Sequence, residues 1–190
     1  MKSPTFITGN QHKADYFARL MDLPIAHQAV QLTEPQSLDL HEIVTHKLHE
    51  AYAVVGGPVI VEDVSLEFTA LRGLPGPFIK FFVEASGVEA CCRMLDGFQD
   101  RGATIRCTFG YYDGSRLELF DSAQPGVIAE QPRGQNGYGF DQIFMHVDSP
   151  LTRAEMSSAD NEATYRDLMK PFAKVREFLQ KLEASSTDPA

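Results

Sequence analysis

The sequence predicts a mixed α/β fold, and three observations support this prediction. Residues 59–61 form an apolar β-branched run without alternation, which is typical of a strand buried on both faces. Residues 40–55 place apolar side chains at helical spacing. Residues 103–112 and 116–122 flank a strong turn signal at 113–115 and predict an antiparallel hairpin. A strand buried on both faces, a helix and a hairpin in one chain together indicate an α/β fold.

Length and composition set the class of protein. A chain of 190 residues with 43% hydrophobic content allows one domain, or one domain with two lobes, over residues 1–184, and we expect 185–190 to be a disordered tail. The net charge of -9 argues against binding of nucleic acid polymers, although a small phosphorylated ligand needs only a local cluster of cations. Without a signal peptide, a long apolar segment or a disulfide framework, we expect a cytoplasmic protein with no membrane span.

The first elements predict an anion site. Residues 5–8 read as a strand and 13–21 as a helix, joined by a glycine turn. Such a turn offers free backbone N–H groups and a helix N-terminus to an anion, and Thr8, Asn10 and Lys13 can add hydrogen bonds and a positive charge. An ordinary turn without a ligand is the alternative.

The chain then predicts a second strand at 24–32, a loop at 33–37 and the helix at 40–55, which ends at the Gly-Gly-Pro of 56–58. On this helix, the periodicity places Lys47 on the polar side.

Two adjacent acids, Glu62 and Asp63, follow the buried run at 59–61. Acids at the carboxyl end of such a strand lie where open α/β sheets bind ligands. Because neighbouring side chains on a strand point to opposite faces, we expect at most one of them to face the ligand, as a Mg²⁺ ligand or as a base that orients water. A solvated strand end is the alternative.

The second half of the chain predicts short elements separated by turns. A glycine-proline cluster at 73–77 is followed by a helix at 88–95, the hairpin and a third antiparallel strand at 125–130. After these we expect a glycine-rich loop at 131–141, a strand at 142–145 and a helix at 162–182 interrupted by Pro171. The loop carries Tyr138, Phe140 and Asp141, and aromatic side chains in such a loop either stack on a flat base or anchor the loop.

Several motifs occur in a characteristic order. They are Thr8-Gly9-Asn10-x-x-Lys13, Val61-Glu62-Asp63, Ala70-Leu71-x-Gly73-Leu74-Pro75-Gly76-Pro77-x-Ile79-Lys80, Cys107-Thr108-Phe109, Pro132-Arg133-Gly134, Gly137-Tyr138-Gly139-Phe140-Asp141 and Ala154-Glu155-Met156. Together they resemble the inosine triphosphate pyrophosphatase (Ham1/RdgB) family from about residue 5 to 182. The run from Gly73 to Lys80 is the most specific of them.

The resemblance implies a Mg²⁺-dependent hydrolase that cuts ITP, dITP and XTP between the α- and β-phosphates and so clears non-canonical purine nucleotides. It also implies an elongated, two-lobed ITPase/Maf-like fold with a long mixed sheet, a central nucleotide cleft and a homodimer.

The matched positions imply roles for individual residues. The catalytic residues would be Asp63, which orients the attacking water, with Lys13 and Glu62; the metal ligands would be Glu34 and Asp63. The residues expected to bind the triphosphate or the base are Thr8, Asn10, Lys13, Lys47, Lys80, Tyr138, Phe140, Asp141, Tyr165 and Arg166.

One segment departs from the family. The family pattern Glu-Lys-Asn-x-x-Ser-His-Arg corresponds here to residues 160–166, a segment one residue shorter. The lysine is missing, Thr164 and Tyr165 replace the serine and the histidine, and Arg166 is unchanged. The resemblance implies that these positions read the 6-oxo group of the purine, so base choice is open. Either Tyr165 replaces the histidine as a donor, or unchanged hydrolysis acts on a different base.

Two other interpretations remain. A Maf-like pyrophosphatase acting on pyrimidine or modified nucleotides is disfavoured by the segment 73–80. A non-catalytic nucleotide sensor is disfavoured by Lys13, Glu34, Asp63 and Lys80, because a binder has no need of an acid that orients water.

Overall fold

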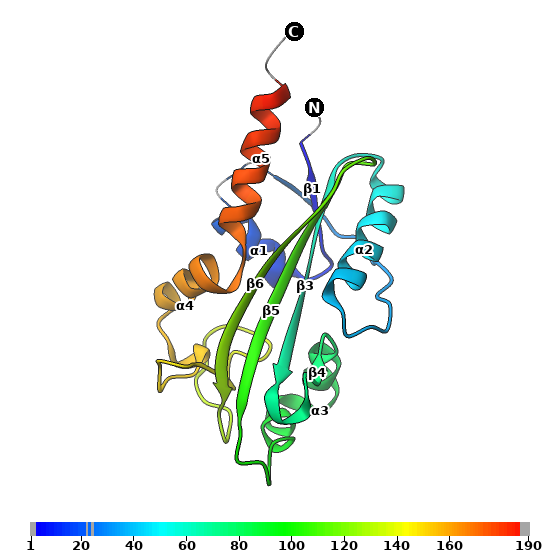
Figure 1. Ribbon diagram of the computed structural model, residues 1–190. Coiled ribbons are helices and arrows are strands. Elements are labelled where there is room, and N and C mark those ends of the chain that lie inside the picture. Colours follow the sequence, from blue (N-terminus) through cyan, green and yellow to red (C-terminus); the bar gives the residue numbers. More distant parts are fainter. Residues whose placement is uncertain (1–2, 22, 24, 187–190) are drawn as a thin grey trace. The chain divides into compact units, whose positions relative to one another are not determined.

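A computed structural model describes residues 3–21, 23 and 25–186, and it confirms a mixed α/β fold (Figure 1). Seven strands form one sheet in the order β2-β1-β3-β5-β6-β7, and β4 pairs with β3. The strands are β1 (Thr5–Ile7), β2 (Ala26–Gln28), β3 (Val59–Phe68), β4 (Pro75–Gly76), β5 (Gly102–Tyr112), β6 (Leu117–Ile128) and β7 (Phe144–His146). The helices are α1 (Gln11–Leu20), α2 (Leu40–Val55), α3 (Ile79–Arg93), α4 (Ser158–Thr164) and α5 (Phe172–Ser186), with short helical turns η1 (Thr69–Leu71), η2 (Arg153–Glu155) and η3 (Tyr165–Met169).

The sheet is mixed because its pairings differ in direction. Strand β1 pairs in parallel with both β2 and β3, whereas β3 with β4 and β6 with β7 are antiparallel. The parallel part therefore belongs to the N-terminal strands, where β1 passes directly into α1.

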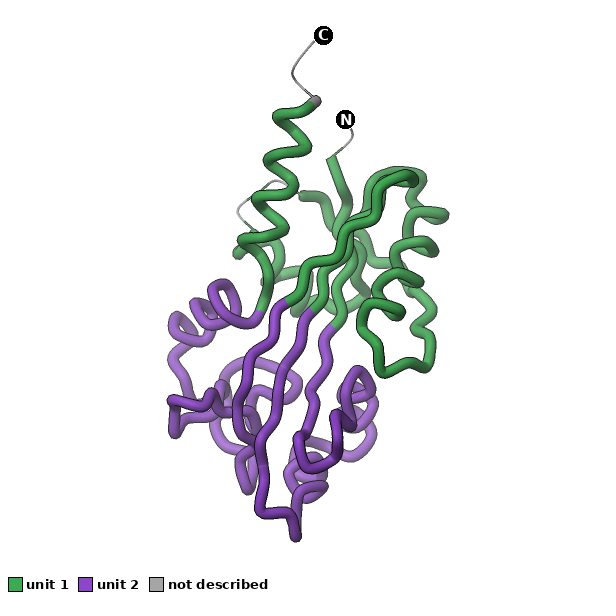
Figure 2. Tube along the Cα trace, viewed as in Figure 1, with its two compact units in different colours: residues 1–63, 108–121, 170–190 green, residues 64–107, 122–169 purple. Residues whose placement is uncertain are grey.

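The chain divides into two compact units (Figure 2). Unit 1 comprises residues 1–63, 108–121 and 170–190, and unit 2 comprises 64–107 and 122–169. Strands β3, β5 and β6 contribute residues to both units, so each unit is assembled from segments far apart in the sequence.

In unit 1, one face of α2 packs on strand side chains. The cluster consists of Ile7, Val44, Leu48, Ala51, Val59 and Val61. Gly110 in β5 permits this approach, because a Cβ atom there would lie 2.5 Å from Val44 and 2.6 Å from Leu48. The helical stripe predicted over residues 40–55 is thus the buried face of α2.

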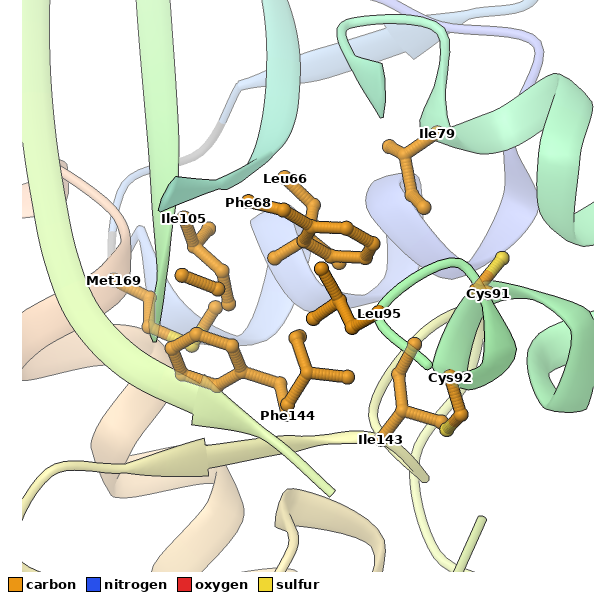
Figure 3. Close-up of a cluster of buried hydrophobic side chains, with 12 residues drawn as sticks. Leu66, Phe68, Ile79, Cys91, Cys92, Leu95, Ile105, Ile143, Phe144 and Met169 are labelled. Carbon is orange, nitrogen blue, oxygen red and sulfur yellow. The ribbon is translucent and has the colours of Figure 1, made fainter. Parts of the chain in front are cut away.

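The core of unit 2 is a separate cluster of buried side chains from strands, α3, η3 and the turns next to α3 and β7 (Figure 3). Its members are Leu66, Phe68, Ile79, Cys91, Cys92, Leu95, Ala103, Ile105, Ile128, Ile143, Phe144 and Met169. Two of the three cysteines therefore serve as small apolar side chains here, and all three are free thiols.

Several predicted boundaries are wrong. Strand β3 continues to Phe68, so Glu62 and Asp63 lie within a strand and not at its end. The expected strand at 125–130 is the second half of β6, since the chain passes Pro125 without a break in the strand. Strand β2 covers only Ala26–Gln28 of the expected 24–32, of which Pro24 lies outside the described residues.

The helices also differ from prediction. Helix α3 starts at Ile79, not at residue 88, and contains a break at Gly87 (φ 81°, ψ 163°). The C-terminal helix begins earlier than residue 162, at Ser158. The predicted interruption at Pro171 is confirmed, because α4 and η3 end before it and α5 begins after it. Helix α5 extends to Ser186, two residues into the segment expected to be a tail, and 187–190 lie outside the described residues.

Candidate functional site

The turn between β1 and α1 is built as an N-cap. The Asn10 side chain accepts a hydrogen bond from the backbone N–H of Lys13 (3.2 Å), and the N–H of Asn10 donates to Thr8 Oγ1 (3.1 Å). The first turn of α1 contains no acidic residue, and a negative side chain there would compete with a bound anion. The anion site at this turn stays a prediction, because an ordinary turn would have the same cap.

Glu62 is the buried acid of this region. Its carboxylate lies 3.6 Å from Lys13 Nζ and forms a close ion pair with Lys170 Nζ, and both Glu62 and Lys170 are buried. Burial alone would raise the pKa of Glu62, but the charges of Lys13, Lys170 and Lys47 outweigh it and lower the pKa to about 2. Glu62 is therefore a permanent negative charge that holds two lysines in place.

Asp63, the next residue on β3, meets a different lysine. Lys47 Nζ donates to Asp63 Oδ2 (2.8 Å) and to Glu34 Oε1 (2.9 Å). Burial would lower the pKa of Lys47, yet the two carboxylates raise it overall, so the amino group stays charged. The expectation that Lys47 lies on the polar side of its helix is wrong, because this pairing compensates the burial of its charge.

Unit 1 thus brings together three lysines and three carboxylates, which are Lys13, Lys47, Lys170, Glu34, Glu62 and Asp63. We call these six residues the lysine–carboxylate cluster. Its charges balance, so an incoming polyphosphate would meet lysines already held in place. The sequence did not single out Lys170, because its charge gains meaning only when the fold places it beside Glu62.

The donor set of this cluster suits Mg²⁺ in one specific mode. Glu34 and Asp63 converge on one point, but among the described residues no three His, Cys, Asp or Glu side chains are arranged to hold a metal ion. Mg²⁺ is commonly held by one or two carboxylates together with substrate phosphates and water. The two carboxylates therefore fit Mg²⁺ that arrives with a triphosphate, and not a permanent all-protein metal site.

Unit 2 places the aromatic candidates near one another. Tyr138 and Tyr165 have nearly parallel rings, with centroids 6.2 Å apart and an interplanar angle of 11°. Asp141 is buried, and its Oδ2 accepts a hydrogen bond from the backbone N–H of Tyr138 (2.9 Å). Gly137 has φ +78°, and a Cβ there would lie 2.1 Å from the Asp141 carboxylate, so this close turn requires glycine.

Three other predicted residues have different surroundings. Phe140 packs against the core cluster of unit 2, which supports the alternative that it anchors the loop. Arg166 forms a two-bond ion pair with exposed Asp167 (2.8 Å for both bonds). Lys80 is exposed in the first turn of α3.

Sequence reasoning gave Arg153 no role. This side chain is completely buried, and its guanidinium carbon lies 3.8 Å from the centre of the Tyr165 ring. It also lies beside Asp141 and Asn161. No sequence pattern indicates this, because an isolated arginine after a loop is usually a surface residue.

No helix within the described ranges is both long and apolar enough to cross a membrane.

Comparison with known proteins identifies similar chains. The model of the Ham1 family matches residues 5–167. An inosine triphosphate pyrophosphatase of Emericella nidulans is 40% identical over 184 residues, covering 94% of this chain and 97% of the relative. One from Batrachochytrium dendrobatidis is 38% identical and covers 95% of each chain. A Ham1 protein structure from Coxiella burnetii has the same fold, with a TM-score of 0.81 at 23% identity, and the match covers 95% of this chain and 100% of that one.

Proposed function

The chain belongs to the Ham1 family, and from this premise we propose that it is a nucleoside triphosphate pyrophosphohydrolase. Its substrates are ITP, dITP and XTP, and its products are the monophosphate and pyrophosphate. The observation that carries the proposal is the lysine–carboxylate cluster of unit 1, which joins buried cations to an acid suited to orient water.

The triphosphate would bind where α1 begins. Backbone N–H groups of the capped turn, the side chains of Thr8 and Asn10, and Lys13 offer donors to phosphate oxygens. Lys47 adds a second cation. Phosphoryl transfer depends mainly on such positioning and on charge neutralisation, which is what these residues supply.

Asp63 would orient and deprotonate the attacking water. Its carboxylate is held by Lys47 and is partly exposed, so a water molecule can reach it. Glu62, on the opposite face of β3, acts indirectly by fixing Lys13 and Lys170. Glu34 and Asp63 would hold Mg²⁺, which supplies neutralisation of the phosphate charge when bound.

The base would contact residues of unit 2. Tyr138 and Tyr165 offer aromatic faces, and Asp141 offers a carboxylate. Phe140 supports this loop from the core side, and the exposed side chains of Arg166 and Lys80 would contact the nucleotide. Their roles follow from family resemblance combined with this placement.

The resemblance also underlies a proposed homodimer that clears non-canonical nucleotides from the pool. The cytoplasmic location expected from the sequence stays a prediction. The protein's net charge of -9 supports selection of free nucleotides over nucleic acid polymers, since an acidic surface repels a polyanion.

Pyrophosphate release tests the proposal. Purified protein with Mg²⁺ is given ITP, dITP, XTP, the ordinary triphosphates and N6- or O6-modified purine triphosphates. Preference for the first three by about 100-fold or more supports the proposal. Release of orthophosphate in place of pyrophosphate, or tight binding without turnover, contradicts it.

A second function is favoured by the altered segment at 160–166. With Asn161, Thr164 and Tyr165 present there, the same hydrolysis could act on a different base, such as a modified purine. The same panel of nucleotides distinguishes the two, because this function requires a modified purine or a Maf-type substrate to exceed ITP.

A further inference from the structure

Arg153 is a charged side chain in an unusual place. It is 0% exposed, and its guanidinium covers the Tyr165 ring at 3.8 Å. Nε and Nη2 donate to Asn161 Oδ1 at 3.1 and 2.5 Å, and Nη1 contacts Met169 Sδ. The Asp141 carboxylate lies 3.5 Å from Nε. Burying a guanidinium against one carboxylate, one amide and a sulfur atom costs folding free energy, so a contribution to stability does not explain the position of Arg153.

Arg153 lies beside the altered segment at 160–166. Residues 160–166 lack the lysine of the related pattern, and two members of that segment, Asn161 and Tyr165, contact Arg153 directly. The positive charge therefore comes from η2, a different part of the chain. The charge of Arg153 also acts on His146, since burial and Arg153 both lower the pKa of that imidazole.

We propose that Arg153 is the positioning residue that sets base selectivity in this protein, acting through Asp141 and Tyr165. This inference deepens the proposed function and rests on it for the identity of the substrate. Arg153 fixes the Tyr165 ring against its guanidinium and compensates the charge of the Asp141 carboxylate.

The selectivity follows from the hydrogen bonds that each base can make. A carboxylate only accepts, whereas a tyrosine hydroxyl can donate. A 6-oxo purine presents an N1–H donor beside an oxygen acceptor and so complements this pair. Adenine presents an N1 acceptor beside an amino donor, which leaves the carboxylate facing a lone pair. Arg153 thus favours a 6-oxo purine without touching it.

Three variants test the proposal. Arg153→Met keeps the length of the side chain and removes its charge, and Arg153→Lys keeps the charge but loses the planar stacking. The matched control is Arg101→Met, since Arg101 is also in unit 2 and its guanidinium donates to the backbone oxygens of Cys92, Ile128 and Ala129.

Two readouts separate this inference from the proposed function. Pyrophosphate release gives kcat and KM for ITP and ATP, and calorimetry gives binding of IMP and AMP without turnover. Arg153→Met is expected to reduce the ITP/ATP ratio of kcat/KM and the IMP/AMP affinity ratio about tenfold or more, mainly through KM. Arg153→Lys should fall between it and the wild type. Arg101→Met should lower Tm and leave both ratios unchanged.

The outcomes are decisive in either direction. If Arg153→Met and wild type have equal ITP/ATP and IMP/AMP ratios, the inference is wrong. It is also wrong if Arg101→Met lowers these ratios as much as Arg153→Met does, because lost stability would then explain both decreases. If Arg153→Met does not fold, wild-type ratios in Arg153→Lys overturn it. If no nucleotide yields pyrophosphate, the proposed function fails, while the IMP/AMP ratios still decide the role of Arg153.

Discussion

Asp63 and Glu62 are adjacent and chemically similar, yet their surroundings give them different work. Glu62 is buried and pairs with Lys13 and Lys170, whereas Asp63 is partly exposed and pairs with Lys47. The alternation of a strand separates them onto opposite faces, so a structural carboxylate and the carboxylate that we propose to be reactive can occupy consecutive positions.

This division predicts the effect of Asp63→Asn. The amide keeps the size of the side chain but cannot take a proton from water, so kcat should fall by about 10²–10⁴-fold with KM for ITP changed little. Steady-state pyrophosphate release measures both. Glu67→Gln, a change to another acid of β3, should retain activity, and a D63N variant within threefold of wild type contradicts the role of Asp63.

Lys170→Met is predicted to destabilise the protein. It removes one cation from the buried Glu62 carboxylate. Loss of the partner of a buried charge costs about 3–5 kcal/mol when no other cation compensates, and less here because Lys13 remains. Urea unfolding measures the change. The double variant with Glu62→Gln should be less destabilised than the two single effects added together, and strict additivity contradicts the pairing.

His146 predicts a pH dependence of stability. Its folded-state pKa is lowered by burial and by Arg153, so the unfolded chain binds a proton more readily. Stability contributed by the neutral form is present above about pH 6.5 and falls as the pH drops toward the lower folded pKa. The Tm of His146→Gln should therefore fall less than that of wild type between pH 7.5 and 5. An identical fall in both proteins contradicts this.

The site shows which residues a sequence can reveal. Asn10 and Lys13 were predictable because an N-cap and a glycine turn are local patterns. Lys170 was not, since its partner Glu62 is 108 positions away in sequence. Arg153 was not either: its partner Asn161 is only eight positions away, but no local pattern marks an arginine as buried. Lys47 was misplaced for the same reason, because periodicity assigns lysine to solvent unless a carboxylate from another element meets it.

At the scale of elements, local signals explain what was predicted well. Helix α2 begins and ends as expected because Asp39 caps its N-terminus and Gly56 takes the left-handed conformation at its C-terminus. Strand β3 was predicted too short, because two acids read as the end of an apolar run. Their lysine partners let the strand continue through them.

Gly87 supports an element-scale prediction. Its φ of 81° and ψ of 163° break α3, and a Cβ atom there would meet nothing within 4 Å. Gly87→Ala should therefore cost about 1–3 kcal/mol through backbone strain alone. Chemical denaturation measures this, with Ser86→Ala as the neighbouring control. A Gly87→Ala protein more stable than wild type means that α3 can straighten, which contradicts a fixed break.

At the scale of the whole molecule, the resemblance predicted two lobes, whereas periodicity could not divide the chain. Each unit has its own core cluster, but both draw on the same three long strands, β3, β5 and β6. Strand propensity predicts such strands. It does not predict which residues of one strand pack into which core, because core membership depends on contacts distant in sequence.

Shared strands lead to a final prediction, that the two units unfold together. Neither unit can lose its core without releasing strand residues that continue into the other, so unfolding should be one cooperative transition. Leu48→Ala in unit 1 and Leu95→Ala in unit 2 each remove a fully buried side chain and should cost about 2–5 kcal/mol. Both should shift the same calorimetric peak, with equal calorimetric and van't Hoff enthalpies, while exposed Leu168→Ala shifts it little. If instead two peaks appear and each core variant moves only one, the units unfold independently and strand continuity does not couple them.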